Sequence, residues 1–180
     1  NGTRGKSNVT RLIAAALRRS GIRTLGKTTG TIPRLILPDR SEKTIRRWAP
    51  PNILEQIKTV AIADKMKAEA LVIECMALDP VLQFVSEKNM IRSTVGVITN
   101  VRPDHFEVMG DSLDDIAEAL SATIPDQGTL ITGDSRYAPF FTAVASEMGS
   151  RVILADAAET EAADCPQGRF LFPENAAIAR

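Results

Sequence analysis

The segment Gly2-Thr3-Arg4-Gly5-Lys6-Ser7 governs the interpretation of this chain, because it has the composition of a phosphate-binding loop. Two glycines let the backbone approach an oligophosphate closely, a lysine supplies positive charge, and a serine offers a hydroxyl to Mg²⁺. A six-residue match is weak alone, since surface turns often share this composition. The residues that follow must therefore support it.

An amphipathic helix is expected directly after the loop. Gly21 stands where a helix C-cap belongs, and the apolar residues recur at helical spacing: Val9, Leu12, Ile13, Ala16 and Leu17. The first N–H groups of such a helix would face the phosphates. A buried strand normally precedes a phosphate loop, so we expect the first strand of the fold to be missing from this sequence.

The rest of the chain alternates between helical and strand patterns. Residues 27–40 are rich in Gly, Thr and Pro and are expected to be irregular. Helices are expected from Asn52, Ser112 and Glu174 and over 140–148, and strands over 71–73, 94–99, 129–132 and 152–155. This order predicts one α/β domain over residues 1–180, a three-layer P-loop-type fold with a mostly parallel sheet flanked by helices.

Composition narrows the class of protein. The hydrophobic share of 44% and charged share of 24% are typical of a soluble globular domain, and no run is long enough to span a membrane. The zero net charge hides an asymmetry, because residues 1–60 carry 13 Lys/Arg against 3 Asp/Glu. Such a surface suits nucleotide phosphates, a polycarboxylate or nucleic acid. Trp48 is the only aromatic residue of this part, so no nucleic-acid partner is expected.

Two predicted strands end in polar residues that suit a site. Glu74 directly follows the strand over 71–73, and Thr99 to His105 follow the next strand along the chain. Ligands of parallel α/β sheets bind beyond the carboxyl ends of the strands. Glu74 and His105 could therefore both reach a cation beside a triphosphate on the loop.

Four motifs in this order resemble the central ATP-binding domain of the Mur ligase superfamily, and within it the subgroup that synthesises poly-γ-glutamate. They are the loop itself, Lys27-Thr28-Thr29-Gly30-Thr31, Glu74, and Ile98-Thr99-Asn100 with Asp104-His105. Members of this superfamily are ATP-dependent amide ligases that join an amino acid to a carboxylate through an acyl phosphate.

The resemblance implies a role for each matching residue. Gly2, Thr3, Arg4, Gly5 and Lys6 would bind the ATP phosphates, with Lys6 also catalytic, and Ser7 would hold Mg²⁺. Glu74 and His105 would be catalytic and hold a second cation, and Asn175 would contact adenine. The basic segment with Lys27, Thr29 and Arg34 would suit an anionic polyglutamate acceptor. The implied partners are ATP, glutamate, that acceptor and membrane subunits of a synthase complex at the cytoplasmic face of the cell membrane.

The sequence departs from the superfamily pattern in two places. Many members carry a carbamylated lysine about fifteen residues after the motif histidine, where this chain has Ala119-Leu120-Ser121 and no lysine follows Lys88. The C-terminal domain that binds the incoming amino acid is expected to be missing.

Other functions stay open at this point. The chain could belong to a folylpolyglutamate or peptidoglycan-precursor ligase, or to a P-loop regulatory NTPase that would not require Glu74 or His105. A nucleic-acid module built on the basic N-terminal third would show a steep salt dependence of binding.

Overall fold

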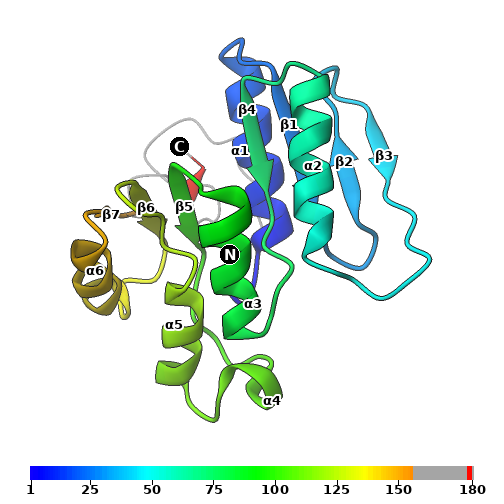
Figure 1. Ribbon diagram of the computed structural model, residues 1–180. Helices are drawn as coiled ribbons and strands as arrows, with labels where there is room; N and C mark the ends of the chain where they lie inside the picture. The colour runs from blue at the N-terminus through cyan, green and yellow to red at the C-terminus, as the bar shows by residue number, and fades with distance from the viewer. Residues whose placement is uncertain (156–177, 180) are drawn as a thin grey trace, which may run out of the picture.

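The computed structural model describes residues 1–155, 178 and 179. Helices and strands alternate along most of this range (Figure 1): α1 Lys6–Arg19, β1 Thr24–Thr28, β2 Arg34–Ile36, β3 Glu42–Thr44, α2 Leu54–Lys65, β4 Ala70–Ile73, α3 Pro80–Val85, the π-helix η1 Ser86–Ile91, β5 Val95–Ile98, α4 Phe106–Met109, α5 Leu113–Ser121, β6 Thr129–Thr132, α6 Ala138–Glu147 and β7 Arg151–Leu154.

The strands form two sheets in the described part of the chain. The first has the order β3-β2-β1-β4, in which β1 and β4 are parallel and β2 and β3 run antiparallel at one edge. The second sheet, β5-β6-β7, is entirely parallel. The prediction of an α/β fold with mostly parallel pairing is confirmed, although the strands are divided between two sheets.

Helices cover both faces of the first sheet. Gly26 in β1 faces α1, since a Cβ built on it would lie 3.4 Å from Cβ of Ala14. Its neighbour Leu25 is fully buried and packs in one cluster with Ala63 of α2. Successive side chains of a strand point to opposite faces, so α1 and α2 lie on opposite sides of the sheet, as in Figure 1. The predicted three layers are therefore present here.

Several local predictions are confirmed by backbone geometry. Gly21 directly follows Ser20, the C-cap of α1, and has the left-handed φ of 86° typical of that position, with the Ile22 N–H donating back to the Leu17 carbonyl. Ser112 and Asp115 form a capping box at the start of α5. Asn52 accepts a hydrogen bond from the Leu54 N–H at the start of α2. The helix expected from Glu174 lies outside the described residues.

Other local predictions are wrong. Residues 27–40 contain the end of β1 and all of β2 rather than irregular structure, and no pattern had indicated β3, α3 or η1. All five residues of β1 are buried although three of them are Thr24, Lys27 and Thr28. Tertiary packing overrides their weak strand signal, because β1 lies between β2 and β4 and is covered by helices on both faces.

A cavity of about 520 Å³ separates the two sheets, lined by both β4 and β5. Asn1 lies at its rim and pairs with the second sheet, since its amino nitrogen donates to the Val97 carbonyl at 2.6 Å and its carbonyl accepts from Thr99 N–H at 3.1 Å. This is a parallel ladder contact. The expectation that a strand of the fold precedes the loop stays a prediction.

Candidate functional site

The loop before α1 adopts a conformation that its glycines allow. Gly2 has φ of 120° and Gly5 has φ of 81°, and Gly5 forms the N-cap of α1. A Cβ on Gly2 would lie 2.1 Å from the Thr99 hydroxyl oxygen, so a larger residue does not fit there. The loop therefore opens directly onto the N-terminus of α1, where the first N–H groups and the helix dipole favour an anion.

Lys6 folds back over this loop. Its ammonium donates to the Gly2 carbonyl at 2.7 Å and to the Thr3 carbonyl at 3.3 Å. Burial lowers the pKa of Lys6, and the nearby Glu74 carboxylate opposes that shift. A half-buried ammonium held only by carbonyl oxygens lacks a full counter-charge, so an anion at the loop would complete its coordination.

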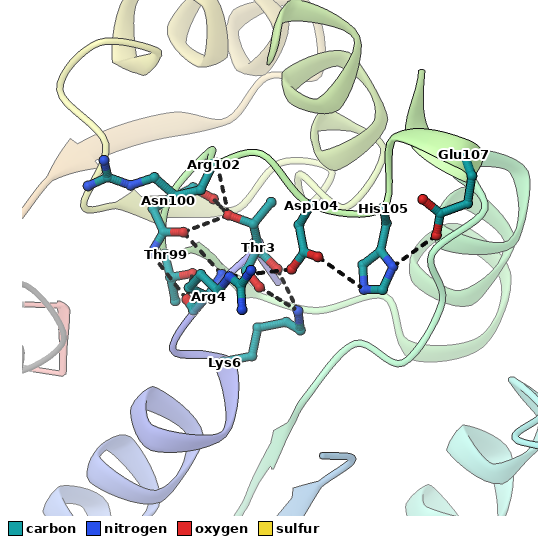
Figure 2. A network of polar contacts seen from close by, with 10 residues as sticks. Thr3, Arg4, Lys6, Thr99, Asn100, Arg102, Asp104, His105 and Glu107 are labelled. Carbon is teal, nitrogen blue, oxygen red and sulfur yellow. Dashed lines mark hydrogen bonds and ion pairs between the residues drawn. The ribbon is translucent and has the colours of Figure 1, made fainter. Parts of the chain in front are cut away.

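Asn100 holds the loop in place, as Figure 2 shows. Its side-chain oxygen accepts from the Thr3 hydroxyl at 2.7 Å and from the Arg4 N–H at 3.1 Å, while its amide nitrogen donates to the Arg4 carbonyl at 3.1 Å. The Thr3 N–H donates to the Asn100 carbonyl, and the Gly2 N–H donates to the Asn1 side chain. Since these three amides are occupied, a phosphate would be bound by the amides from Gly5 onward.

Thr99 and Arg102 extend the same clamp. The Thr99 hydroxyl donates to the Arg4 carbonyl at 2.6 Å, and the Arg102 N–H donates to the Thr3 hydroxyl at 2.9 Å. Both residues follow β5 of the second sheet. The second sheet therefore holds the loop that precedes α1, and α1 packs on the first sheet. The sequence analysis included Thr99 and Asn100 in a motif but predicted no role for either residue. The signal that could have identified them is an amide and a hydroxyl directly after a buried strand.

Asn100→Ala is expected to raise the KM for ATP about tenfold, because it removes three hydrogen bonds and leaves loop groups unsatisfied at about 1–3 kcal/mol. Steady-state kinetics of the full-length protein measure it. Asn100→Asp keeps the accepting oxygen and loses the donor, so it should lie between the wild type and the alanine variant. An unchanged KM in a folded Asn100→Ala protein would contradict the clamp.

Glu74 joins three parts of the site. It is only 4% exposed, follows β4, and one carboxylate oxygen accepts from the Ser7 hydroxyl at 2.8 Å and from the Thr29 N–H at 2.7 Å. Gly30 lies beside Ser7 as well, since a Cβ on it would be 3.2 Å from the Ser7 hydroxyl oxygen. The structure thus brings together Ser7, Glu74 and Thr29. Carboxylate and hydroxyl oxygens are ligands that hard divalent cations prefer.

His105 belongs to a second set of polar contacts, in which its ring lies between Asp104 and Glu107 (Figure 2). Asp104 lies between the Arg4 guanidinium at 3.5 Å and the His105 ring at 3.7 Å, and Glu107 contacts the opposite ring nitrogen at 3.3 Å. Among residues 1–155, 178 and 179, no three His, Cys, Asp or Glu side chains are grouped to hold a metal. The described residues therefore do not assemble Glu74 and His105 into one complete ligand set.

The predicted acceptor residues have different positions. Lys27 is fully buried, donates to Gln56 at 2.8 Å and pairs with Glu55 at 3.6 Å. Its charge is paired inside the domain, and its buried position does not support contact with an acceptor. Thr29 lies at the Glu74 site, and Arg34 is partly exposed and pairs with Glu42 at 3.3 Å.

The segment that stands where many superfamily members carry a carbamylated lysine lies in α5. Ala119, Leu120 and Ser121 are buried in α5, in the core of the second half, so that segment does not supply a ligand to the loop. Asn175 lies outside the described residues, and its predicted contact with adenine stays a prediction.

Comparison with known proteins identifies the family of this chain. A family model described as the Mur ligase middle domain matches residues 1–170. The chain is 44% identical over 182 aligned residues to the capsule biosynthesis protein CapB of Bacillus anthracis, covering 99% of this chain and 39% of that protein. It is 43% identical to PGA synthase CapB of Bacillus subtilis (strain 168), covering 99% and 46%.

A solved structure gives the same fold at low identity. It is a bifunctional folylpolyglutamate synthase/dihydrofolate synthase with Mn, AMPPNP and L-glutamate bound, with a TM-score of 0.63, 16% identity, and coverage of 99% of this chain and 50% of that one. The chain therefore belongs to the Mur ligase family and contains its middle domain. It spans less than half the length of the two CapB relatives.

Proposed function

We propose that this domain binds ATP and a divalent cation in an amide ligase that adds glutamate to a growing poly-γ-glutamate chain. Membership of the Mur ligase family supports ATP-dependent ligation, and the two CapB relatives, one of them named a PGA synthase, support the polymer. The Mur family structure with AMPPNP, Mn and L-glutamate supports the nucleotide and metal.

The observation that carries the proposal is the convergence of Ser7, Thr29 and Glu74 beside Lys6. A triphosphate and an acceptor carboxylate are both anions, so positive charge between them is needed to let them approach each other. Ser7 and Glu74 share a hydrogen bond of 2.8 Å and offer hard oxygen ligands for a cation, which we propose is Mg²⁺. That ion would neutralise phosphate charge; His105 is proposed to help hold a second one.

The remaining chemistry is positioning by this chain. The amides from Gly5 onward and Lys6 hold the β- and γ-phosphates, and Thr29 and Arg34 are proposed to contact the acceptor carboxylate. The γ-phosphoryl group passes to that carboxylate, giving an acyl phosphate and ADP. The glutamate amine then attacks the acyl carbon, the C–N bond forms, and phosphate leaves with the C–O bond electrons. Holding the reactants in line supplies most of the acceleration.

The direct test is ADP formation by the full-length protein with ATP and Mg²⁺, with and without glutamate and polyglutamate. We expect continued ADP release over many turnovers to require both the amino acid and the acceptor, and mass spectrometry to show that the product chain lengthens. A folate or a peptidoglycan precursor as the preferred acceptor would overturn the polymer assignment. ADP release that needs neither substrate would favour the regulatory NTPase instead.

Membrane subunits and a position at the cytoplasmic face of the membrane are part of this proposal. Within the described residues, no helix has the length and apolar character needed to cross a bilayer. Co-purification of the full-length protein with subunits from detergent-extracted membranes would test for these partners.

A further inference from the structure

Four arginines form a stripe over α1 and the β2–β3 hairpin, on the face of the first sheet that α1 covers. We name this set the arginine stripe: Arg11, Arg18, Arg34 and Arg40. Arg11 and Arg18 are seven residues apart on α1, so they lie on one face of the helix about 10 Å apart. Arg34 and Arg40 come from the start of β2 and from the turn that follows it.

The stripe begins at the catalytic edge. Arg34 is in register with Thr28, the last residue of β1, and Thr29 donates to Glu74. Glu42 of β3 pairs with Arg34 at 3.3 Å and also with Arg11, which ties the hairpin to α1. This end of the stripe therefore lies next to the place where an acceptor carboxylate would meet ATP.

The far end of the stripe has more positive charge than the protein itself neutralises. Burial lowers the pKa of Arg18, and the positive charge of Arg40 lowers it further, while Glu42 opposes both. In the described part of the chain, Nη1 of Arg18 is the one buried side-chain polar atom without a hydrogen-bond partner. Asp39, beside Arg40, is engaged by Ser41 through two hydrogen bonds. Arg18 and Arg40 thus lack carboxylate partners among the described residues.

We propose that the arginine stripe binds the already formed part of the polyglutamate acceptor, leading it away from the catalytic edge along α1. A linear polyanion of regularly spaced carboxylates complements a linear row of guanidinium groups, which are suited to bidentate pairing with carboxylates. This rests on the proposed function, and it adds that affinity for the acceptor grows with its length. A short acceptor would occupy only Thr29 and Arg34.

The test uses the full-length ligase with Arg18→Gln and Arg40→Gln combined, and a matched control with Lys58→Gln and Lys65→Gln on α2, across the sheet. We expect the stripe variant to raise the KM of a twenty-residue polyglutamate about five- to tenfold, while the KM for triglutamate and for ATP stays within about twofold. Added salt should weaken binding of the long acceptor to the wild type more than to the stripe variant.

Three outcomes would overturn the stripe. The first is an unchanged KM for the long acceptor in the stripe variant. The second is an equal rise in KM for the long and the short acceptor, and the third is an equal rise in KM in the α2 control. Thermal melting checks that each variant is folded. Direct binding of fluorescent polyglutamate, measured without turnover, separates failure of the stripe from failure of the proposed function: if no ligation occurs, weaker binding by the stripe variant still supports the stripe, and unchanged binding rejects it. Tighter binding of an oligonucleotide of equal charge would also reject it.

Discussion

Replacing Glu74 with glutamine is expected to lower kcat for glutamate-dependent ADP formation by about 10³-fold, close to 4 kcal/mol of transition-state stabilisation. The carboxylate is 4% exposed and accepts from both the Ser7 hydroxyl and the Thr29 N–H, so it fixes two groups that flank the proposed phosphate site. Glutamine has nearly the same shape and keeps an accepting oxygen for the Thr29 N–H. The lower kcat would therefore result from the missing negative charge on the cation ligand and not from a change of fold.

Two measurements make the Glu74 result specific. Glu118→Gln removes an exposed carboxylate from α5 and should leave kcat unchanged. Glu74→Gln should also require a higher Mg²⁺ concentration for half-maximal activity, whereas a variant that is merely unstable would show a lower melting temperature at every Mg²⁺ concentration. Near wild-type turnover by a folded Glu74→Gln protein would exclude a metal role for this residue and favour a P-loop module that does not need it.

Lys6→Met should lower kcat by about 10²- to 10³-fold, the usual loss when one group that stabilises transition-state charge is removed. Its ammonium now donates to the Gly2 and Thr3 carbonyls, which places the charge directly over the loop. Methionine fills a similar volume without charge, and it also relieves the cost of the half-buried ammonium. We therefore expect the variant to be at least as stable as the wild type while it loses activity.

The matched control for Lys6 is Lys58→Met, which removes an exposed ammonium from α2 and should leave both kcat and the KM for ATP unchanged. Calorimetry of nucleotide binding completes the comparison. Lys6→Met should weaken the binding of ATP more than the binding of ADP if the ammonium contacts the γ-phosphate. Equal weakening of both nucleotides would place Lys6 on the β-phosphate alone. Full activity would remove Lys6 from the proposed machinery.

Local chemical patterns predicted much of this site. The phosphate loop depends on glycines and on a short distance to the next helix, which are both properties of neighbouring residues. Glu74 could be assigned because a carboxylate directly after an apolar strand of a parallel sheet falls at its carboxyl edge. The Ser112 capping box and the Gly21 cap are equally local, since each is decided within about one helical turn.

Contacts between distant residues could not be predicted in the same way. Asn100 and Arg4 are 96 positions apart, and nothing in either neighbourhood shows that they share two hydrogen bonds. Lys27 reads as a free cation in a basic segment, yet the packing of α2 on β1 buries it against Gln56 and Glu55. The strands β1 to β3 were missed because burial by neighbouring elements, and not residue propensity, stabilises them.

The amino-acid sequence by itself therefore determined the loop, the α/β class, the charge asymmetry and the family resemblance, because these depend on residue types and on short spacings. Tertiary structure alone decided which amides of the loop remain available for phosphate and which cations remain available for an acceptor. Those properties arise when Asn100, Glu74 and Glu55 reach partners far along the chain. The Asn100 side chain occupies the Arg4 N–H, and Glu55 pairs with the Lys27 ammonium inside the domain, so these two groups are not left for a ligand.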